Sequence, residues 1–285
     1  MPSLSIARTP RRPATAAISA AALAAITGAA HADFSYPDFA AASGLSLVGA
    51  ANTTGSSLSI APAQHRVAGA VWHQQKQAVA NGFETTFSVR ITGLQGDGAD
   101  GLALVLQNQS ATALGGTGGA MGYAENHVFA QPGIAGALAI ELDLWNNAPA
   151  GDWNDPDSSH VSLQSRGPLL EASPDHTHSL AWNHLAADLS DGALHVVSIS
   201  YVPGILSVYV DDLNNPVLSA NVDLASLIAL DAGRAWVGLT AATGGASDVQ
   251  GHEITGWTFT TVPAPGPAAL LGLGGLLASR RRRPN

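Results

Sequence analysis

The segment from residue 138 to residue 163 constrains the fold of this chain most, because it combines strand periodicity with many ligand-type side chains. Its first part alternates between two sets of residues, namely Leu138, Ile140, Leu142 and Leu144, and Ala139, Glu141, Asp143 and Trp145. This period of two predicts a strand with one apolar face and one face that carries two carboxylates. Carboxylates two residues apart on one face repel each other, so we expect a positive charge between them.

The loop that follows this strand adds further groups that can bind a metal ion. They are Asn147, Asp152, Asp155, Asp157 and His160. Oxygen ligands suit calcium, whereas carboxylates with one imidazole suit manganese or another transition ion. One strand-loop-strand unit could therefore hold two metal ions. The alternative interpretation is an exposed sheet face with two solvated carboxylates, followed by an ordinary polar loop.

The order of these residues resembles the metal-binding loop of the legume-type (L-type) lectins. The matching pattern is Glu141-x-Asp143-x-Trp145-x-Asn147, then Asp155-Pro156 and His160. The resemblance implies a calcium ion held by Asp143, the Trp145 carbonyl, Asn147 and Asp155. It also implies a manganese-type ion held by Glu141, Asp143, Asp155 and His160. Residues 148–152 resemble a small insertion, which leaves Asp152 and Asp155 as alternatives, and the five-residue step to His160 favours Asp155.

Three other stretches resemble the same family. Ala99-Asp100-Gly101 is similar to the lectin Ala-Asp-Gly, in which the first peptide bond is cis and the aspartate binds sugar hydroxyls. In the glycine-rich segment 114–123, the resemblance implies that Gly119 offers its backbone N–H to the sugar. Residues 236–260 resemble the C-terminal lectin signature, and their loop 245–250 corresponds to the specificity loop of the family. The alternatives are an ordinary Asp-Gly turn, a flexible linker and a hairpin turn without function.

The resemblance covers residues 34–260 and implies an all-β fold, a concanavalin-like jelly-roll sandwich of two antiparallel sheets. We assign this domain to residues 33–261. The 31 glycines and the 12% of charged residues agree with a turn-rich all-β protein. The pattern predicts strands at 83–91 and 102–106, a hairpin over 194–210 and a short helix within 224–230. The implied carbohydrate-binding residues are Asp100, Gly119, Trp145, Asn147, Gly245 and Ala246, with the Trp145 ring stacked on the sugar.

The two ends of the sequence predict export from a bacterial cell. Residues 1–32 have a basic start, an Ala-rich apolar run and Ala30-His31-Ala32 as a cleavage site, which is typical of a secretory signal. Residues 262–285 resemble the PEP-CTERM sorting tail, which an exosortase-type membrane enzyme removes, although Ala264 stands where that signature has Glu. The alternative is an uncleaved anchor. We expect a protein at the cell envelope or surface, or secreted.

Charge and composition limit the partners of the central domain. Between residues 33 and 262 the chain has 21 acidic and 5 basic residues, which argues against nucleic acid as a partner. The absence of cysteine excludes disulfides and zinc-thiolate sites. The cluster of His176, His178 and His184 has no standard metal-site spacing, so we expect an exposed loop there. An exposed back sheet would permit a homodimer.

These observations favour an exported lectin that depends on calcium and manganese and is not an enzyme. A glycoside hydrolase on the same sandwich is the rival of a different class. Laminarinase-type enzymes carry Glu-x-Asp-x-x-Glu, and Glu141-x-Asp143 matches the first half, but the third position is Asn146 and the acid that retaining chemistry needs is missing. A structural matrix or adhesion module without an active sugar site is the third interpretation, because of the unusual loops 148–152 and 245–250.

Overall fold

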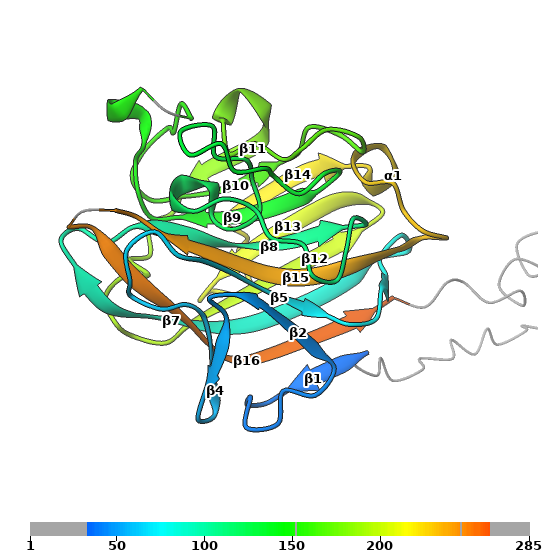
Figure 1. The fold of residues 1–285 in the computed structure, drawn as a ribbon. Coiled ribbons are helices and arrows are strands. Elements are labelled where there is room, and N and C mark those ends of the chain that lie inside the picture. The colour runs from blue at the N-terminus through cyan, green and yellow to red at the C-terminus, as the bar shows by residue number, and fades with distance from the viewer. Residues whose placement is uncertain (1–32, 152, 246, 263–285) are drawn as a thin grey trace, which may run out of the picture.

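The protein folds as two stacked antiparallel β-sheets, which confirms the predicted sandwich (Figure 1). The computed structural model describes residues 33–151, 153–245 and 247–262. The secretory signal, the sorting tail, Asp152 and Ala246 therefore lie outside the described residues, except that Val262 is included. No helix within those ranges is long and apolar enough to cross a membrane.

One sheet, here called the front sheet, contains the strands of the segment 138–163. Its strands run in the order β11-β10-β9-β8-β15-β5-β2, and β6 pairs with the start of β15. The bounds are β2 Leu45–Gly49, β5 Ala68–His73, β6 Gln77–Ala78, β8 Asp100–Gln107, β9 Leu138–Asp143, β10 His160–Gln164, β11 Ser179–His184 and β15 Arg234–Thr243.

The other sheet, the back sheet, has the order β14-β13-β12-β7-β16-β4-β3, and β1 also pairs with β16. The bounds are β1 Phe34–Tyr36, β3 Asn52–Thr54, β4 Ser57–Ala61, β7 Phe83–Gln95, β12 His195–Val202, β13 Gly204–Val210, β14 Leu218–Val222 and β16 Val249–Thr261. The predicted hairpin is confirmed as β12 and β13, and the predicted helix as α1, Leu224–Leu227, capped by the Asp223 side chain.

Two separate apolar clusters stabilise the front sheet, one on each face. The cluster between the sheets takes the residues of β9 that point inward, such as Ile140 and Leu142. The second cluster lies on the outer face, where Ala103 and Ala139 pack against Met121 and Tyr123 of the long connection between β8 and β9. Small side chains on the sheet allow that connection to lie close, and it covers the face that would otherwise be open to water.

Glu141 and Asp143 belong to this covered outer face, because they alternate with the residues that point into the sandwich. Both side chains are buried, at 0% and 2% exposure. The alternative of two solvated carboxylates on an open sheet face is therefore wrong. The connection that contains the 3-10 helix η1, Gly118–Ala120, shields this part of the sheet, and no local pattern in the sequence indicates that cover.

Candidate functional site

The register of the front sheet brings the candidate ligands together. In the β9–β10 pair, Asp143 lies opposite His160, and Glu141 lies opposite Ser162. On the other side of β9, Asp143 pairs with Gly101 of β8, the residue after Asp100. The peptide bond between Ala99 and Asp100 is cis, as the resemblance implies. Residues that are far apart in the sequence thus meet at one end of three adjacent strands.

Glu141 is held by two hydroxyl groups that the sequence analysis did not include. The Tyr123 hydroxyl donates to Oε1 of Glu141, and the Ser162 hydroxyl donates to Oε2. The position of Ser162 could have been deduced from the register, since it stands two residues after His160 as Glu141 stands two residues before Asp143. Tyr123 comes from the connection outside the sheet, and nothing in the sequence pattern links it to Glu141.

Backbone groups of the loop after β9 orient the other carboxylates. The Trp145 N–H donates to Oδ1 of Asp143 over 2.9 Å, and the Asn147 N–H donates to Oδ2 of Asp155 over 2.6 Å. Asp155 is buried beside this loop, at 7% exposure. The structure therefore brings Asp155 into the same cluster as Asp143, whereas Asp152 lies outside the described residues.

The buried carboxyl groups resist ionisation. Burial raises the pKa of Asp100 to about 7, with a hydrogen bond from Asn147 opposing the shift and the charge of Asp155 adding to it. Burial likewise raises the pKa of Glu141 to about 7, although Ser162 and Tyr123 lower it. Burial and the nearby charges of Asp155 and Glu141 raise the pKa of Asp143 well above its usual range. A cation among these groups would favour their charged forms.

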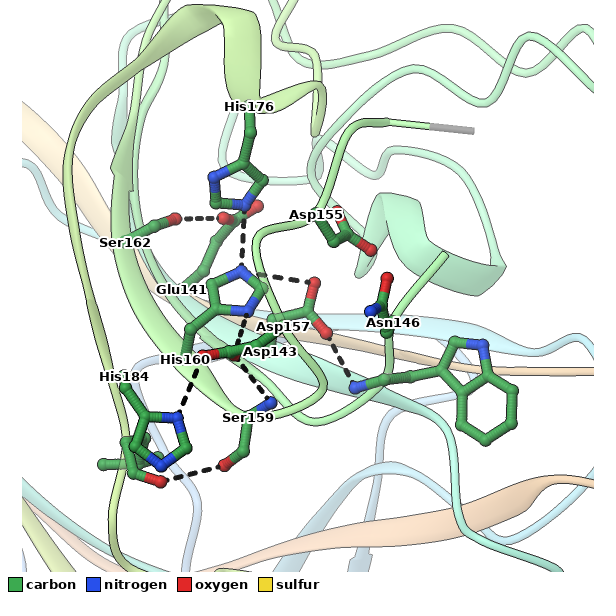
Figure 2. A network of polar contacts seen from close by, with 12 residues as sticks. Glu141, Asp143, Asn146, Asp155, Asp157, Ser159, His160, Ser162, His176 and His184 are labelled. Atoms are coloured by element: carbon green, nitrogen blue, oxygen red, sulfur yellow. Dashed lines mark hydrogen bonds and ion pairs between the residues drawn. The ribbon is translucent and has the colours of Figure 1, made fainter. Parts of the chain in front are cut away.

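His160 lies at the centre of the cluster, and His176 reaches it from a separate segment (Figure 2). Nε2 of His160 is 3.8 Å from Oδ2 of Asp143, and its Nδ1 is 3.4 Å from Oδ1 of Asp157. Nε2 of His176 is 2.9 Å from Nε2 of His160. The expectation of an exposed loop is wrong for His176, which stands in the 3-10 helix η3, His176–His178, and is half-buried against the cluster.

Asn147 provides the test of whether these residues fit a hard cation. Its Oδ1 is buried and has no hydrogen-bond partner within the described residues. A buried carbonyl oxygen without a partner costs free energy, and such an oxygen beside carboxylates is a ligand that calcium prefers. The donor set therefore fits the metal ions that the resemblance implies: Asp143, Asn147, Asp155 and the Trp145 carbonyl for calcium, and Glu141, Asp143, Asp155 and His160 for a transition ion.

Five of the six residues implied in sugar binding line one cavity next to this cluster, and the sixth, Ala246, lies outside the described residues. The cavity has a volume of about 370 Å³. Among its lining residues are Asp100, Gly119, Trp145, Asn147 and Gly245. Oδ2 of Asp100 is buried without a hydrogen-bond partner in the described part of the chain. A carboxylate oxygen and an aromatic ring at one cavity are groups that recognise sugar hydroxyls and the apolar face of a sugar ring.

Among the other side chains that line the cavity are Arg66, Phe129 and Trp153, which no sequence pattern indicated. Trp153, just beyond the inserted segment, packs so closely on Gly119 that a Cβ there would lie 2.4 Å from the indole ring. Phe129 is 45% exposed at the rim, and the guanidinium carbon of Arg66 lies 5.0 Å from the centre of its ring. These residues come from three loops distant in sequence, so only the fold brings them together.

Comparison with known proteins places the chain among carbohydrate-binding folds. The model of the legume lectin beta-barrel domain matches residues 37–255. Among solved structures, a lectin of Bauhinia forficata in complex with GalNAc has 22% identity and a TM-score of 0.65, over 81% of this chain and 98% of that one.

Two other solved structures agree with this match. Lectin I-B4 of Griffonia simplicifolia, in a metal-free form, has 21% identity and a TM-score of 0.65, over 81% of this chain and 99% of that one. The acidic lectin of winged bean in complex with methyl-α-D-galactose has 23% identity and a TM-score of 0.64, over 81% and 98%. The likeness confirms the predicted concanavalin-like jelly-roll sandwich.

Proposed function

This chain belongs to the legume lectin domain family, and on that premise we propose that it is an exported lectin that binds carbohydrate through a calcium- and manganese-type centre. One observation carries the proposal: Asp100, Gly119, Trp145, Asn147 and Gly245 converge on a single cavity beside the buried carboxylates. The cavity lies at the small end of the range of about 300–1,000 Å³ for ligand pockets, which suits one or two sugar units.

Each residue has a separate role in this proposal. The carboxylate of Asp100 and the amide of Asn147 hydrogen-bond sugar hydroxyls, and the backbone N–H of Gly119 donates to the sugar. The Trp145 ring stacks on the apolar face of the sugar, and the loop 245–250, which begins with Gly245 and Ala246, sets specificity. A bound metal ion neutralises the carboxylates and fixes the loop that carries Asn147, so that the sugar meets a site that is already ordered.

The proposed ligand is extracellular polysaccharide or a glycoconjugate, recognised through neutral hydroxyl groups. The relatives are lectins by name, and Asn146 has no carboxyl group to act as the second acid of a glycosidase. Its Oδ1 instead accepts the Ala148 N–H over 2.9 Å and shapes the loop. We therefore propose binding without catalysis.

A glycan array with and without EDTA tests the proposal. Binding should disappear with EDTA, and it should fall by about 10- to 150-fold in Asp100→Asn, since a hydrogen bond to a charged group contributes about 1.5–3 kcal/mol. Glu84→Gln is the matched control, because Glu84 is exposed on β7 of the back sheet. Binding that survives both EDTA and Asp100→Asn would contradict the proposal.

A structural or adhesion module is a second candidate, and Trp153 is the observation that favours it. Its side chain is only 6% exposed and rests on Gly119, at the position where a sugar would meet the backbone. A protein that takes up calcium and melts at a higher temperature with it, but binds no glycan on the array, would support this candidate over the lectin.

The proposal includes export and sorting, which rest on the composition of residues 1–32 and 262–285. An exosortase-type enzyme would remove the C-terminal tail after the first segment has been cleaved at Ala32. Mass spectrometry of the protein recovered from its native bacterium tests both cleavages. A homodimer through the outer face of the back sheet completes the proposal, and sedimentation of the purified protein measures it.

A further inference from the structure

We propose that His176 is a second imidazole ligand of the transition-ion position, in addition to His160. The inference rests on the metal centre of the proposed function and changes the class of ion that this centre selects. It is carried by the contact between the two imidazoles, by the orientation of His160 and by the backbone bonds that hold His176 in place.

The distances fit two nitrogen ligands on one ion. The two Nε2 atoms are 2.9 Å apart. Ligand atoms at about 2.1 Å from an ion and at right angles to each other lie roughly 3.0 Å apart. One ligand atom from each of Glu141, His160 and His176 lies within 4.8 Å of the other two, so a carboxylate oxygen is near the same point. Figure 2 shows the two rings directed toward each other beside Glu141.

The carboxylate of Asp157 lies beside the other ring nitrogen of His160. Its Oδ1 is 3.4 Å from Nδ1 of His160, and its Oδ2 is 2.9 Å from Nδ1 of His184. A carboxylate beside Nδ1 favours the tautomer that carries its proton there, which leaves the lone pair of Nε2 for a metal ion. That nitrogen faces His176 and Asp143, and does not face water.

His176 is fixed by the same loop that carries Asp155. The His176 N–H donates to the Trp153 carbonyl over 2.8 Å. Asp175 accepts from the Asn154 side chain over 3.0 Å and from the Thr177 N–H over 2.8 Å, which caps η3 and ties it to the loop. The second imidazole is therefore placed by hydrogen bonds to the segment just after residues 148–152.

A set of two imidazoles with carboxylates favours zinc, cobalt or nickel over calcium and magnesium, since imidazole suits these transition ions and hard cations prefer oxygen. The calcium position has only oxygen ligands from Asp143, Trp145, Asn147 and Asp155. The two positions of the centre should thus differ in the ions they accept. The competing interpretation is a hydrogen bond between two neutral imidazoles that bind no common ion.

Cobalt binding to the full chain, with calcium present in excess, tests the inference. The exchangeable ring N–H of each cobalt-bound imidazole gives a paramagnetically shifted proton resonance, so the spectrum counts the coordinated histidines. We expect two such resonances in the unaltered protein and one in His176→Ala. His178→Ala is the matched control, since His178 stands in the same turn and has no side-chain contact to the cluster among the interactions found in the described residues.

Calorimetry with cobalt alone gives a second readout. The affinity should fall by at least about tenfold in His176→Ala, because loss of even the groups that orient a ligand costs about 10- to 100-fold. One imidazole resonance in the unaltered protein, or no cobalt binding, overturns the inference and needs no variant. The glycan array in calcium is a separate readout. Sugar binding together with a single imidazole resonance would support the lectin proposal and contradict the role of His176. Two imidazole resonances without sugar binding would support the role of His176 and contradict the lectin proposal.

Discussion

Within the described residues, two clusters bring a histidine to carboxylates, and they differ in burial and in the balance of charge. On the back sheet, Nδ1 of His195 is 2.8 Å from Oδ2 of Asp211, and its Nε2 is 3.0 Å from Oδ1 of Asp191. Burial lowers the pKa of His195, but the hydrogen bonds to Asp211 and Asp191 outweigh it and the pKa is raised. At His160, burial outweighs the attraction of Asp157 and the pKa is lowered.

The difference shows how the same residue types form an ion pair in one place and a set of candidate metal ligands in another. Asp191 and Asp211 are about half exposed, so water solvates the charge that His195 does not neutralise. Around His160 the carboxyl groups of Asp100, Glu141, Asp143 and Asp155 are all buried. One imidazole cannot compensate that many charges away from water, and a multivalent cation can.

The largest effect should come from removing Asp143, the carboxylate shared by both proposed metal positions. At calcium concentrations of 100 times Kd, the unaltered protein should gain about 2.7 kcal/mol in its free energy of unfolding. In Asp143→Asn this gain should vanish, as measured by thermal melts across a calcium titration. The metal-free variant should melt no lower than the metal-free parent, because one source of repulsion is gone.

Asp211→Asn supplies the other half of the comparison. It removes a carboxylate of the same type from the His195 cluster, so the calcium-dependent gain should stay intact. A calcium response that survives Asp143→Asn, or disappears in Asp211→Asn, would break the distinction between the two clusters.

The next largest effect concerns pH in the metal-free protein. The pKa values of Asp100 and Glu141 are about 7 in the folded state, above the usual range near 4 of an unfolded chain. A raised carboxyl pKa means that the folded state binds more protons, so stability is full below about pH 4 and is lost as the pH rises through 7. The loss should be on the order of a few kcal/mol in EDTA.

Saturating calcium should reduce or reverse this dependence, because metal binding requires the deprotonated carboxylates. Urea unfolding at several pH values between about 5 and 8 gives the slope of the free energy of unfolding against pH, once in EDTA and once in calcium. Equal slopes in the two conditions would mean that the buried carboxyl groups do not belong to the metal centre.

A smaller effect, on sugar affinity, is expected to differ between two glycines that line the proposed sugar cavity. A Cβ at Gly119 would lie 2.4 Å from the Trp153 ring and 2.6 Å from Oδ1 of Asn147, so Gly119→Ala must displace one of them. We expect sugar affinity to fall about tenfold or more, because displacing either side chain would lengthen or break hydrogen bonds to the sugar. Titration calorimetry with the best glycan from the array measures the change.

Gly245→Ala is the matched substitution at another glycine that lines the cavity. The added Cβ would meet Nε of Arg66 at 2.8 Å, which is part of a long, exposed side chain that can move aside. Affinity should therefore change little. If the two variants lose affinity equally, the contact between Gly119 and Trp153 does not shape the site.

The smallest effect should be seen at the His195 cluster, where both carboxylates are about half exposed. His195→Gln should lower the free energy of unfolding by about 1 kcal/mol or less, as for other surface ion pairs. Because the folded pKa of His195 is raised, its contribution is fully present below about pH 6.5 and is lost as the pH rises through the folded value. Unfolding of the variant and the parent at about pH 5.5 and pH 9 should show a difference only at the lower pH.

Sequence patterns predicted the parts of the site that lie on one continuous segment. Alternation located the strand of Glu141 and Asp143, and the five-residue step to His160 favoured Asp155, which the structure places beside Asn147. The resemblance indicated the cis peptide before Asp100, which the structure has. These features depend on neighbours in the sequence, so a single chain without its fold already contains the information.

The remaining residues depend on contacts between distant segments. Tyr123, His176 and Trp153 reach the cluster or the cavity from three different connections, and their positions are set by how those connections pack on the outer face of the front sheet. A histidine in a polar loop has the same local pattern whether it is exposed or bound to a cluster. His176 packs against the cluster because hydrogen bonds tie η3 to the loop of Trp153, and those bonds join segments that no local pattern connects.

The places of β15 and β16 in the two sheets bear on how the protein is made. β15 lies between β8 and β5, and β16 lies between β7 and β4, so each sheet has an internal gap until residues 234–261 have left the ribosome. Pairing across such long sequence separations is slow. Until its last two strands are available, the nascent chain should therefore have open strand edges in both sheets and unshielded acidic groups. Before these strands are available, the incomplete chain should be a substrate for chaperones that bind unfolded proteins.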